Sequence, residues 1–244
     1  MNRALVAGAA GMAAQQSIID AISANLANAD TPGYRVDRPE FAALIAPDGQ
    51  TLGTADGAPR KLFSQGKLET TNNPDDLAID GEGLFEVQTT GGRAAFTRAG
   101  NFTPDAQGRL RLPGGAALAD IRLPHGVTQT TIGEDGTVRC RVAGKSGAVI
   151  AGHIGLCAFA DNPRLRFGAD GLFYPTQAAG KCYHGRPGSG GFGALRQRCL
   201  ERANVNVIGA MMAVLAAQRA YEASAKTVQA ADELLRLANN LERG

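Results

Sequence analysis

Tryptophan is absent from this chain, and aromatic residues make up only 5% of its 244 residues. Enzyme pockets are usually lined with aromatic side chains, so this composition argues against a small-molecule enzyme. An excess of charge of one sign is also missing, because 25 lysines and arginines stand against 23 aspartates and glutamates. The balance gives no electrostatic basis for binding nucleic acid or an anionic membrane surface. The length allows one large domain or two small ones.

Long uninterrupted apolar runs are missing too, so we expect no transmembrane helix. The amino terminus carries one arginine followed by a short apolar segment, an arrangement typical of a secretion signal peptide. However, Gln15, Gln16 and Ser17 interrupt this segment while its helical period continues through them. We therefore expect the amino-terminal residues to belong to the mature fold and not to a cleaved signal.

Metal-binding spacings are absent from the sequence. The four cysteines form no C-x-x-C pair and the three histidines are scattered, so we expect no metal site and no cofactor. Two interpretations of the cysteines stay open, namely idle thiols or one or two disulfides in an oxidising compartment. The cysteines are Cys140, Cys157, Cys182 and Cys199.

Catalytic motifs are also missing. The segment from Gly188 to Gly193 matches G-x-G-x-x-G by letter, but the preceding KCYHGRP is no buried strand and no acidic residue lies near position 213. This segment is interpreted as a glycine-rich turn. Asp75, Asp76, Asp80 and Glu82 have no spacing that pairs them for hydrolysis. The sequence therefore offers no catalytic residues, and we expect that the protein is not an enzyme.

Residues 3–29 show a helical period with one apolar stripe. The larger apolar residues of the stripe are Leu5, Met12, Ile19, Ile22 and Leu26. Most other positions are small or polar, so a neighbouring backbone can approach closely over Gly8 and Gly11. Pro32 is expected to end the helix, and Gly33 readily takes a positive φ.

The carboxyl end repeats a heptad period over about five heptads. Its larger residues lie seven positions apart: Val207, Val214, Tyr221, Val228 and Leu235. The pattern predicts a helix of roughly 35 residues, capped by Asn204 or Asn206 and about 50 Å long. A compact domain of this size would not enclose so long a helix. Part of it must pack either on the amino-terminal helix or on other copies of the chain.

Between the helices the sequence predicts an antiparallel β domain. Short alternating runs such as LFEVQ and AAFTR are separated by turn signals such as TGG and EDG. The predicted fold class is α+β, with long terminal helices that form a coiled-coil region around the inserted antiparallel β domain. The predicted domains are a helical assembly domain at 1–34 and 203–244, an extended connector at 35–63 and the β domain at 64–202.

Three blocks of the sequence resemble the axial proteins of the bacterial flagellum, the rod and hook proteins. The blocks are RALVAGAAGMAAQQSIIDAISANLANADTPGYR, then FSQGKLETTNNPDDLAIDGEGLFEV with FTRAGNF, and finally NVNVIGAMMAVLAAQRAYEASAKTVQAADELL. The positions that match the family motifs are Asn25, Asn28, Thr31, Pro32, Gly33, Asn204, Asn206, Gln218, Arg219 and Glu222. The resemblance is loose over residues 140–193, and the cysteines belong to no pattern of the family.

The resemblance implies a structural subunit of the flagellar basal-body rod that polymerises into a hollow, torque-transmitting shaft through its terminal helices. It also implies export through the flagellar secretion channel without a cleaved signal peptide, and a location in the basal body that spans the periplasm. The implied partners are copies of the same chain, other rod and hook proteins, the surrounding ring proteins and the export apparatus, with no nucleic acid.

Within the family, the carboxyl-terminal block favours the distal part of the rod. The segment between Phe41 and Ser64 is shorter than is usual there, which keeps the proximal rod and the hook as alternatives. The alternative from another class is a secreted carbohydrate-active β enzyme with helical ends, against which the lack of tryptophan argues.

Overall fold

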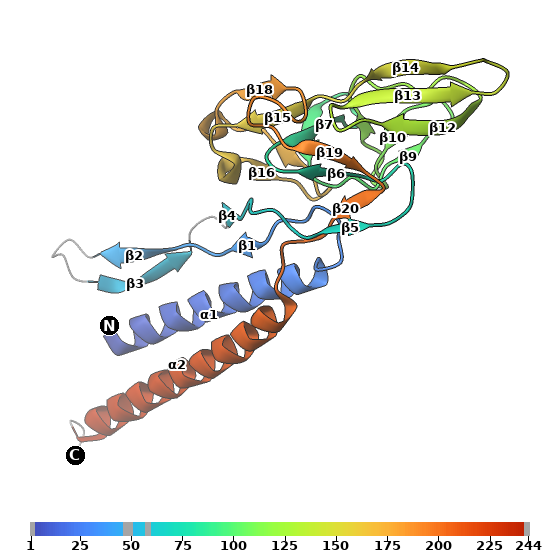
Figure 1. Cartoon of the computed structure of the whole chain (residues 1–244). Helices are drawn as coiled ribbons and strands as arrows, with labels where there is room; N and C mark the ends of the chain where they lie inside the picture. Colours follow the sequence, from blue (N-terminus) through green and yellow to red (C-terminus); the bar gives the residue numbers. More distant parts are fainter. Residues whose placement is uncertain (1–2, 46–50, 57–59, 242–244) are drawn as a thin grey trace. The chain divides into compact units, whose positions relative to one another are not determined.

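The computed structural model describes residues 3–45, 51–56 and 60–241, and the chain folds into two compact units (Figure 1). Unit 1 combines residues 1–29, 36–62 and 205–244, and unit 2 combines residues 30–35 and 63–204. The chain therefore crosses between the units after residues 29, 35, 62 and 204.

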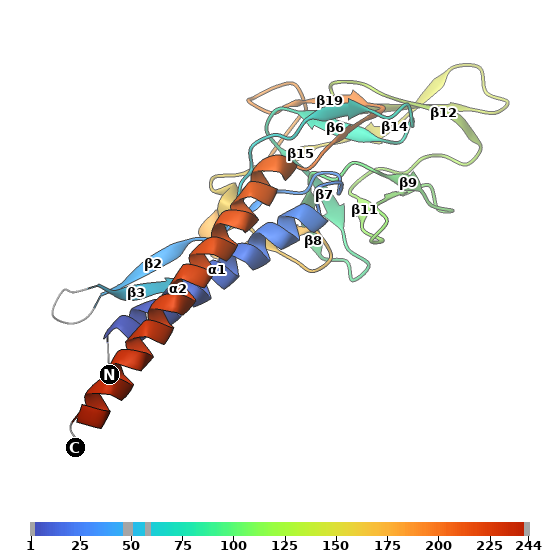
Figure 2. The ribbon, with the colours of Figure 1, turned by 90° about the horizontal axis from the view of Figure 1, so that it is seen from below.

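Unit 1 is built on two helices that lie side by side, α1 (Arg3–Ala27) and α2 (Val207–Leu241) (Figures 1 and 2). α2 has 35 residues, as predicted. Asn206 caps it, because its side-chain Oδ1 accepts the backbone N–H of Gly209 at 2.9 Å. α1 ends before Pro32, and the Asn28 side-chain amide donates to the carbonyl of Ala24 at 2.9 Å.

Small residues line the contact between the two helices. A Cβ atom added to Gly8 would lie 2.5 Å from Val228 Cγ2, and one added to Gly11 would lie 3.4 Å from Ser224 Oγ. Ala217 of α2 is buried. The predicted close approach is therefore confirmed at Gly8, where it occurs within a single chain, whereas the contact at Gly11 leaves room for a Cβ.

α1 also has the length and composition of a membrane span, over the 23 residues Leu5–Ala27. The expectation of no transmembrane helix did not take this property into account. It depended on uninterrupted apolar runs, whereas this stretch is apolar on average despite Gln15, Gln16 and Ser17. Signal sequences and core helices of soluble proteins have the same property, and α1 packs against α2.

Four short strands lie in the segment for which the sequence predicts an extended connector. They are β1 (Asp37–Arg38), β2 (Phe41–Ile45), β3 (Thr51–Asp56) and β4 (Arg60–Lys61), with β1 paired to β4 and β2 to β3. Asn25 of α1 holds β1, because its side-chain amide donates to the Asp37 carbonyl at 2.8 Å and its oxygen accepts the Asp37 N–H at 2.7 Å. Lys61 Nζ pairs with Asp37 Oδ2 at 2.7 Å. These contacts join the helix and the strands of unit 1.

Unit 2 is antiparallel β structure, as predicted, with every strand pair of the described residues antiparallel. Its largest sheet runs β16–β17–β8–β7–β11–β10–β9, and β15 pairs with both β7 and β18. The strands are β7 (Leu84–Gln88), β8 (Ala94–Thr97), β9 (Thr103–Pro104), β10 (Leu110–Arg111), β11 (Ala117–Leu118), β15 (Leu156–Phe159), β16 (Arg166–Phe167), β17 (Phe173–Tyr174) and β18 (Cys182–Gly185).

The other strands of unit 2 form smaller sheets. They are the three-stranded sheet of β12 (Val127–Ile132), β13 (Thr137–Val142) and β14 (Ala148–His153), and the pairs β6 (Leu77–Asp80) with β19 (Ala194–Gln197) and β5 (Leu68–Thr70) with β20 (Cys199–Glu201). Two short 3₁₀ helices, η1 (Asn162–Arg164) and η2 (Gln177–Ala179), lie between β15 and β18. The turn predicted from EDG joins β12 to β13, and Gly136 takes a φ of 83° there.

Two hydrophobic clusters fill unit 2. The larger one includes the fully buried side chains of Leu77, Phe85, Phe102 and Leu110. The second cluster consists of Leu84, Phe96, Cys157, Phe159, Leu165, Phe173 and Ala179.

The helix contact can be tested with a matched pair of substitutions. Gly11→Ala is expected to stabilise the full chain by up to about 1 kcal/mol, because alanine is the better helix former and its Cβ has room. Gly8→Ala is expected to destabilise the chain, because the new Cβ would displace the stiff β-branched side chain of Val228. Thermal unfolding followed by far-UV circular dichroism measures both, and equal effects would contradict the close contact at Gly8.

Candidate functional site: a buried ionic cluster near the chain crossings

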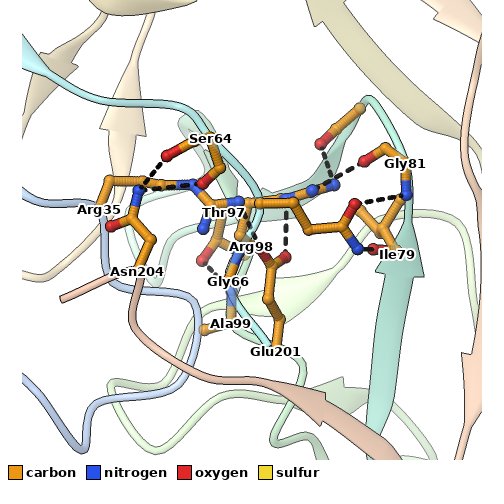
Figure 3. A network of polar contacts seen from close by, with 12 residues as sticks. Arg35, Ser64, Gly66, Ile79, Gly81, Thr97, Arg98, Ala99, Glu201 and Asn204 are labelled. Atoms are coloured by element: carbon orange, nitrogen blue, oxygen red, sulfur yellow. Dashed lines mark hydrogen bonds and ion pairs between the residues drawn. The ribbon is translucent and has the colours of Figure 1, made fainter. Parts of the chain in front are cut away.

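A buried carboxylate joins two arginines in unit 2 (Figure 3). Glu201 ends β20, Arg98 follows β8 directly and Arg35 immediately precedes a crossing to unit 1. Arg35 Nη2 lies 2.8 Å from Glu201 Oε1, and Arg98 Nε lies 3.0 Å from Glu201 Oε2. The side chains of Arg35 and Glu201 are 0% exposed, and that of Arg98 is 4% exposed. We call these three residues the Glu201 cluster.

The guanidinium of Arg98 uses all three of its nitrogens. Besides the contact with Glu201, Nη1 donates to the Gly83 carbonyl and Nη2 to the Gly81 carbonyl, each at 2.8 Å. Burial lowers the pKa of Arg98 to about 10, an effect that Glu201 partly offsets. Arg98 therefore remains charged at neutral pH and holds the turn between β6 and β7.

Arg35 makes fewer hydrogen bonds than Arg98. Its Nε and Nη1 have no hydrogen-bond partner among the described residues, and its contact with Glu201 is a close ion pair and not an aligned hydrogen bond. The cluster places two positive charges against one negative charge in a buried site. A buried charge is costly unless it is paired, so both arginines depend on Glu201.

Backbone N–H groups also bind Glu201, one at its carboxylate and one at its backbone carbonyl. The N–H of Gly66 donates to Glu201 Oε1 at 2.7 Å, and the N–H of Gly33 donates to the Glu201 carbonyl at 2.7 Å. Gly33 has a φ of 70°, as the sequence suggests, and a Cβ there would lie 2.3 Å from the Ala99 nitrogen. Only glycine fits this position without displacing the backbone beside Arg98.

Each crossing of the chain lies next to a residue that bonds to the segment 201–204. Asp30 pairs with Arg202 at 2.7 Å, and Arg35 pairs with Glu201. The Asn204 side-chain amide donates to the carbonyl and the hydroxyl of Ser64, both at 3.0 Å (Figure 3). The segment 201–204 therefore contacts the residues of unit 2 that lie beside the other three crossings.

The family-motif residues predicted from the sequence separate between the units. Asn25, Asn28 and Asn206 make the helix and strand contacts of unit 1 described above, whereas Thr31, Pro32, Gly33 and Asn204 lie in unit 2. Gln218, Arg219 and Glu222 are exposed on α2. Sequence reasoning missed Arg35, Arg98 and Glu201 as a group. Their only signal was that Arg35 and Arg98 lie in TPGYR and FTRAGNF, two segments of the blocks that carry the resemblance.

The candidate acids have structural contacts. Asp76 is buried and accepts hydrogen bonds from Thr71 Oγ1 at 2.6 Å and Asn73 Nδ2 at 3.0 Å. Burial and the neighbouring Asp76 raise the pKa of Asp75. Asp80 pairs with Arg196 at 3.2 Å on the surface. Among the described residues, no group of three histidines, cysteines or acids could hold a metal ion.

The G-x-G-x-x-G segment is a turn in the structure. It connects β18 to β19 with positive φ angles at Gly188, Gly190 and Gly191, and a strand follows it where a dinucleotide site would need a helix. The interpretation as a glycine-rich turn is confirmed.

Removal of the buried carboxylate tests the Glu201 cluster. Glu201→Gln keeps the side-chain shape but leaves two buried guanidinium groups without a counter-charge, so we expect a loss of about 3–5 kcal/mol in the free energy of unfolding. Glu69→Gln is the matched control, because Glu69 pairs with Arg202 across half-exposed side chains and its loss is expected to cost under about 1 kcal/mol. Chemical denaturation of the full chain compares the two, and similar losses would show that the two arginines do not depend on the charge of Glu201.

Sequence models of three flagellar domains match the chain. The "Flagella basal body rod protein" model covers residues 5–35, the "Flagellar hook protein FlgE/F/G D1 domain" model covers 78–140, and the "Flagellar basal body rod FlgEFG protein C-terminal" model covers 196–241. The Glu201 cluster draws one residue from each of these three regions.

Curated relatives agree with these matches. Flagellar basal-body rod protein FlgG of Borreliella burgdorferi is 35% identical over 264 aligned residues that cover 100% of both chains. FlgG of Caulobacter vibrioides is 34% identical, with 98% of this chain and 99% of the relative covered. Flagellar hook protein FlgE of Rhizobium meliloti is 35% identical over 59% of this chain and 37% of its own length. The chain therefore belongs to the flagellar basal-body rod protein family, and it is a structural protein of the flagellar basal body and not an enzyme.

Proposed function

We propose that copies of this chain polymerise through α1 and α2 into a hollow rod that transmits torque. The observation that carries this proposal is an open apolar face on α2, formed by Ile208, Met211, Met212 and Leu215. Their spacing of three and four residues places them on one side of the helix. Ile208 is 74% exposed and Met212 is 67% exposed. A contiguous exposed apolar surface of this kind is typical of a protein interface.

α2 divides its surface between two kinds of contact. Ala217 and Ala231 are buried in unit 1 and Val228 packs against Gly8 of α1, whereas the residues of the open face are exposed. Residues two positions apart on a helix point in roughly opposite directions, about 200° apart, so Met212 and Val214 face different surroundings. The face that contains Ala217 and Ala231 therefore supports the helix pair within the chain, and the open apolar face is available to a neighbouring copy.

The proposal also assigns an assembly role to the apolar residues that the sequence analysis identified along both helices. The side chains of Leu5, Met12, Ile19, Ile22, Leu26, Val214 and Val228 are half-buried. Val207 and Tyr221 are more open, and the side chain of Leu235 lies outside the described residues. In a rod, a coiled-coil arrangement between copies would cover the open members of the stripes.

The proposed location is the part of the basal body that spans the periplasm, and the proposed partners are other rod and hook proteins, ring proteins and the export apparatus. Export without a cleaved signal is supported by α1 itself, since Gly8 lies in the helix contact and removal of the segment would destroy it. The full-length match to rod proteins, against a partial match to a hook protein, supports the rod over the hook. The distal rod remains our first assignment and the proximal rod our second.

A charge on the open face, at Leu215, and one on the heptad stripe, at Tyr221, test the proposal. Leu215→Asp and Tyr221→Asp are expected to abolish rod assembly, because an aspartate in a desolvated contact costs several kcal/mol and the loss repeats in every subunit. Both side chains are exposed in the single chain, so the thermal stability of the monomer is expected to change little. Electron microscopy of purified basal bodies measures assembly.

The matched control is Ile150→Asp on β14, because Ile150 and Leu215 are both 59% exposed. The control variant is expected to assemble. Normal rods with Leu215→Asp, or loss of rods in all three variants, would contradict an assembly contact on α2.

A further inference from the structure

Two cysteines of unit 2 are joined across a pair of neighbouring strands. Cys157 lies in β15 and Cys182 begins β18, and these strands pair so that Cys157 faces His184 and Cys182 faces Phe159. The two cysteines are therefore diagonal neighbours on one face of the sheet. Their Cα atoms are 5.8 Å apart and a disulfide connects them. This separation is typical of disulfides in proteins.

The bridge closes an excursion of the chain over residues 160–181. The excursion contains η1, β16, β17 and η2, and it contributes Leu165, Phe173 and Ala179 to the second hydrophobic cluster. Its hairpin meets the rest of the sheet through the single register pair Phe173 and Phe96. Because few ladder contacts hold the excursion, a covalent link at its base is well placed to keep it closed.

Aromatic contacts connect the excursion to residues beside the chain crossings. The ring of Phe167 lies 6.3 Å from that of Tyr34, and the ring of Phe173 lies 5.0 Å from that of Phe63. Tyr34 precedes Arg35 of the Glu201 cluster, and Phe63 is the first residue of unit 2 after a crossing. Opening of the excursion would remove these aromatic supports.

We propose that Cys157 and Cys182 are an oxidative modification site whose bridge forms only after the chain has left the cytoplasm and then locks the excursion. The timing rests on the proposed function, because it requires a location outside the reducing cytoplasm. In the reaction, the two thiols reduce the disulfide of an oxidised dithiol protein. One sulfur–sulfur bond forms in this chain, one breaks in the oxidant, and two electrons and two protons pass to the oxidant, which leaves as a dithiol.

The surroundings of the two sulfurs indicate the order of events. Cys182 is half-buried whereas Cys157 is 0% exposed, so Cys182 is the thiol that an oxidant reaches first. His184 Nδ1 lies 4.0 Å from Cys182 Sγ and 3.4 Å from Glu86 Oε2. The imidazole can take the thiol proton, and the carboxylate stabilises the imidazolium that results. Cys157 then attacks the mixed disulfide at Cys182 and releases the reduced oxidant.

The remaining cysteines supply an internal control. Cys140 is buried in the larger hydrophobic cluster, and burial raises the pKa of its thiol. Cys199 lies on β20, where its sulfur is 3.8 Å from Thr70 Oγ1. Both are free thiols in the structure.

The first test uses the purified full chain, reduced and then incubated with oxidised glutathione as the oxidant. We expect two titratable thiols in the oxidised protein and four in the reduced protein. The reduced protein is expected to unfold about 5–10 °C lower. Trypsin is expected to cut it at least about tenfold faster at Arg164, Arg166 or Lys181, because cleavage follows local opening of the excursion.

Variants assign the effect to the right pair. Cys140→Ala/Cys199→Ala is expected to retain the oxidation-dependent protection, and fragments cut between Cys157 and Cys182 should separate only after reduction. Cys157→Ala/Cys182→Ala is expected to behave as the reduced protein in either condition.

His184→Gln is expected to slow oxidation several-fold without changing the final thiol count. The proposal is overturned if four thiols remain after oxidation, if the bridge involves Cys140 or Cys199, or if trypsin cuts the oxidised and the reduced chain at equal rates. If the Cys157→Ala/Cys182→Ala variant fails to fold, the comparison of the oxidised and the reduced natural chain still decides the question.

A second test separates this proposal from the proposed function. Thiols are trapped by alkylation in cells, and the chain is then compared in cytoplasmic and basal-body fractions. With the alkylating reagent applied under denaturing conditions so that buried thiols also react, we expect four free thiols in the cytoplasmic pool and two in basal bodies. Four thiols in basal bodies would overturn the bridge proposal alone, whereas absence of the chain from basal bodies would overturn the proposed location and leave the bridge to the test on purified protein.

Discussion

The structure of unit 2 depends on one desolvated carboxylate. Glu201 is the negative charge that contacts both Arg35 and Arg98, and all three side chains are buried. A buried ion pair gains little over an apolar core, but loss of one partner leaves an uncompensated charge. The interaction therefore favours one arrangement strongly over alternatives in which any of the three residues is displaced. Because Arg35 and Arg98 are 63 residues apart and Glu201 is more than 100 residues further along, the interaction forms only when unit 2 has its complete topology.

In unit 1, α2 has one face that packs on α1 and another face that is exposed. The helices approach closely because Gly8 of α1 packs against Val228 of α2, where a Cβ on residue 8 would have no room. Packing of this kind buries little apolar area per residue, so the helix pair gains only modest stability from it. The side chains of the open face, Ile208 and Met212 among them, remain exposed and have most of their burial energy still to gain. Such a helix is stable enough to form within the chain and is further stabilised when another apolar surface covers it.

Much of this arrangement could be predicted from the sequence, because the relevant signals are local. Heptad spacing predicted both helices, Asn206 was one of two predicted caps, and turn signals predicted the antiparallel hairpins of unit 2. The strands at 35–63 were predicted only as an extended connector, because prolines and glycines recur along that segment. The Glu201 cluster could not be predicted, because nothing local distinguishes a buried arginine such as Arg98 from a solvated one. The pairing of Cys157 with Cys182 had the same limit, since an even number of cysteines gives several pairings and only the register of β15 and β18 selects one.

The positions of the crossings explain why buried charge is useful in a subunit of this kind. Force applied to either helix can reach unit 2 along the backbone, and it arrives next to Asp30, Arg35, Ser64 or Asn204. Asp30, Arg35 and Ser64 are each bonded to a residue of the segment 201–204, which begins at the last residue of β20, so a load on one crossing is shared by the strand pair β5 and β20. A purely apolar contact at the same place could slide, because the hydrophobic effect is not directional. Ion pairs and hydrogen bonds require particular distances and angles, and they therefore oppose displacement in every direction. In the proposed torque-transmitting rod, this directional constraint matters more than the small net stability that the Glu201 cluster adds.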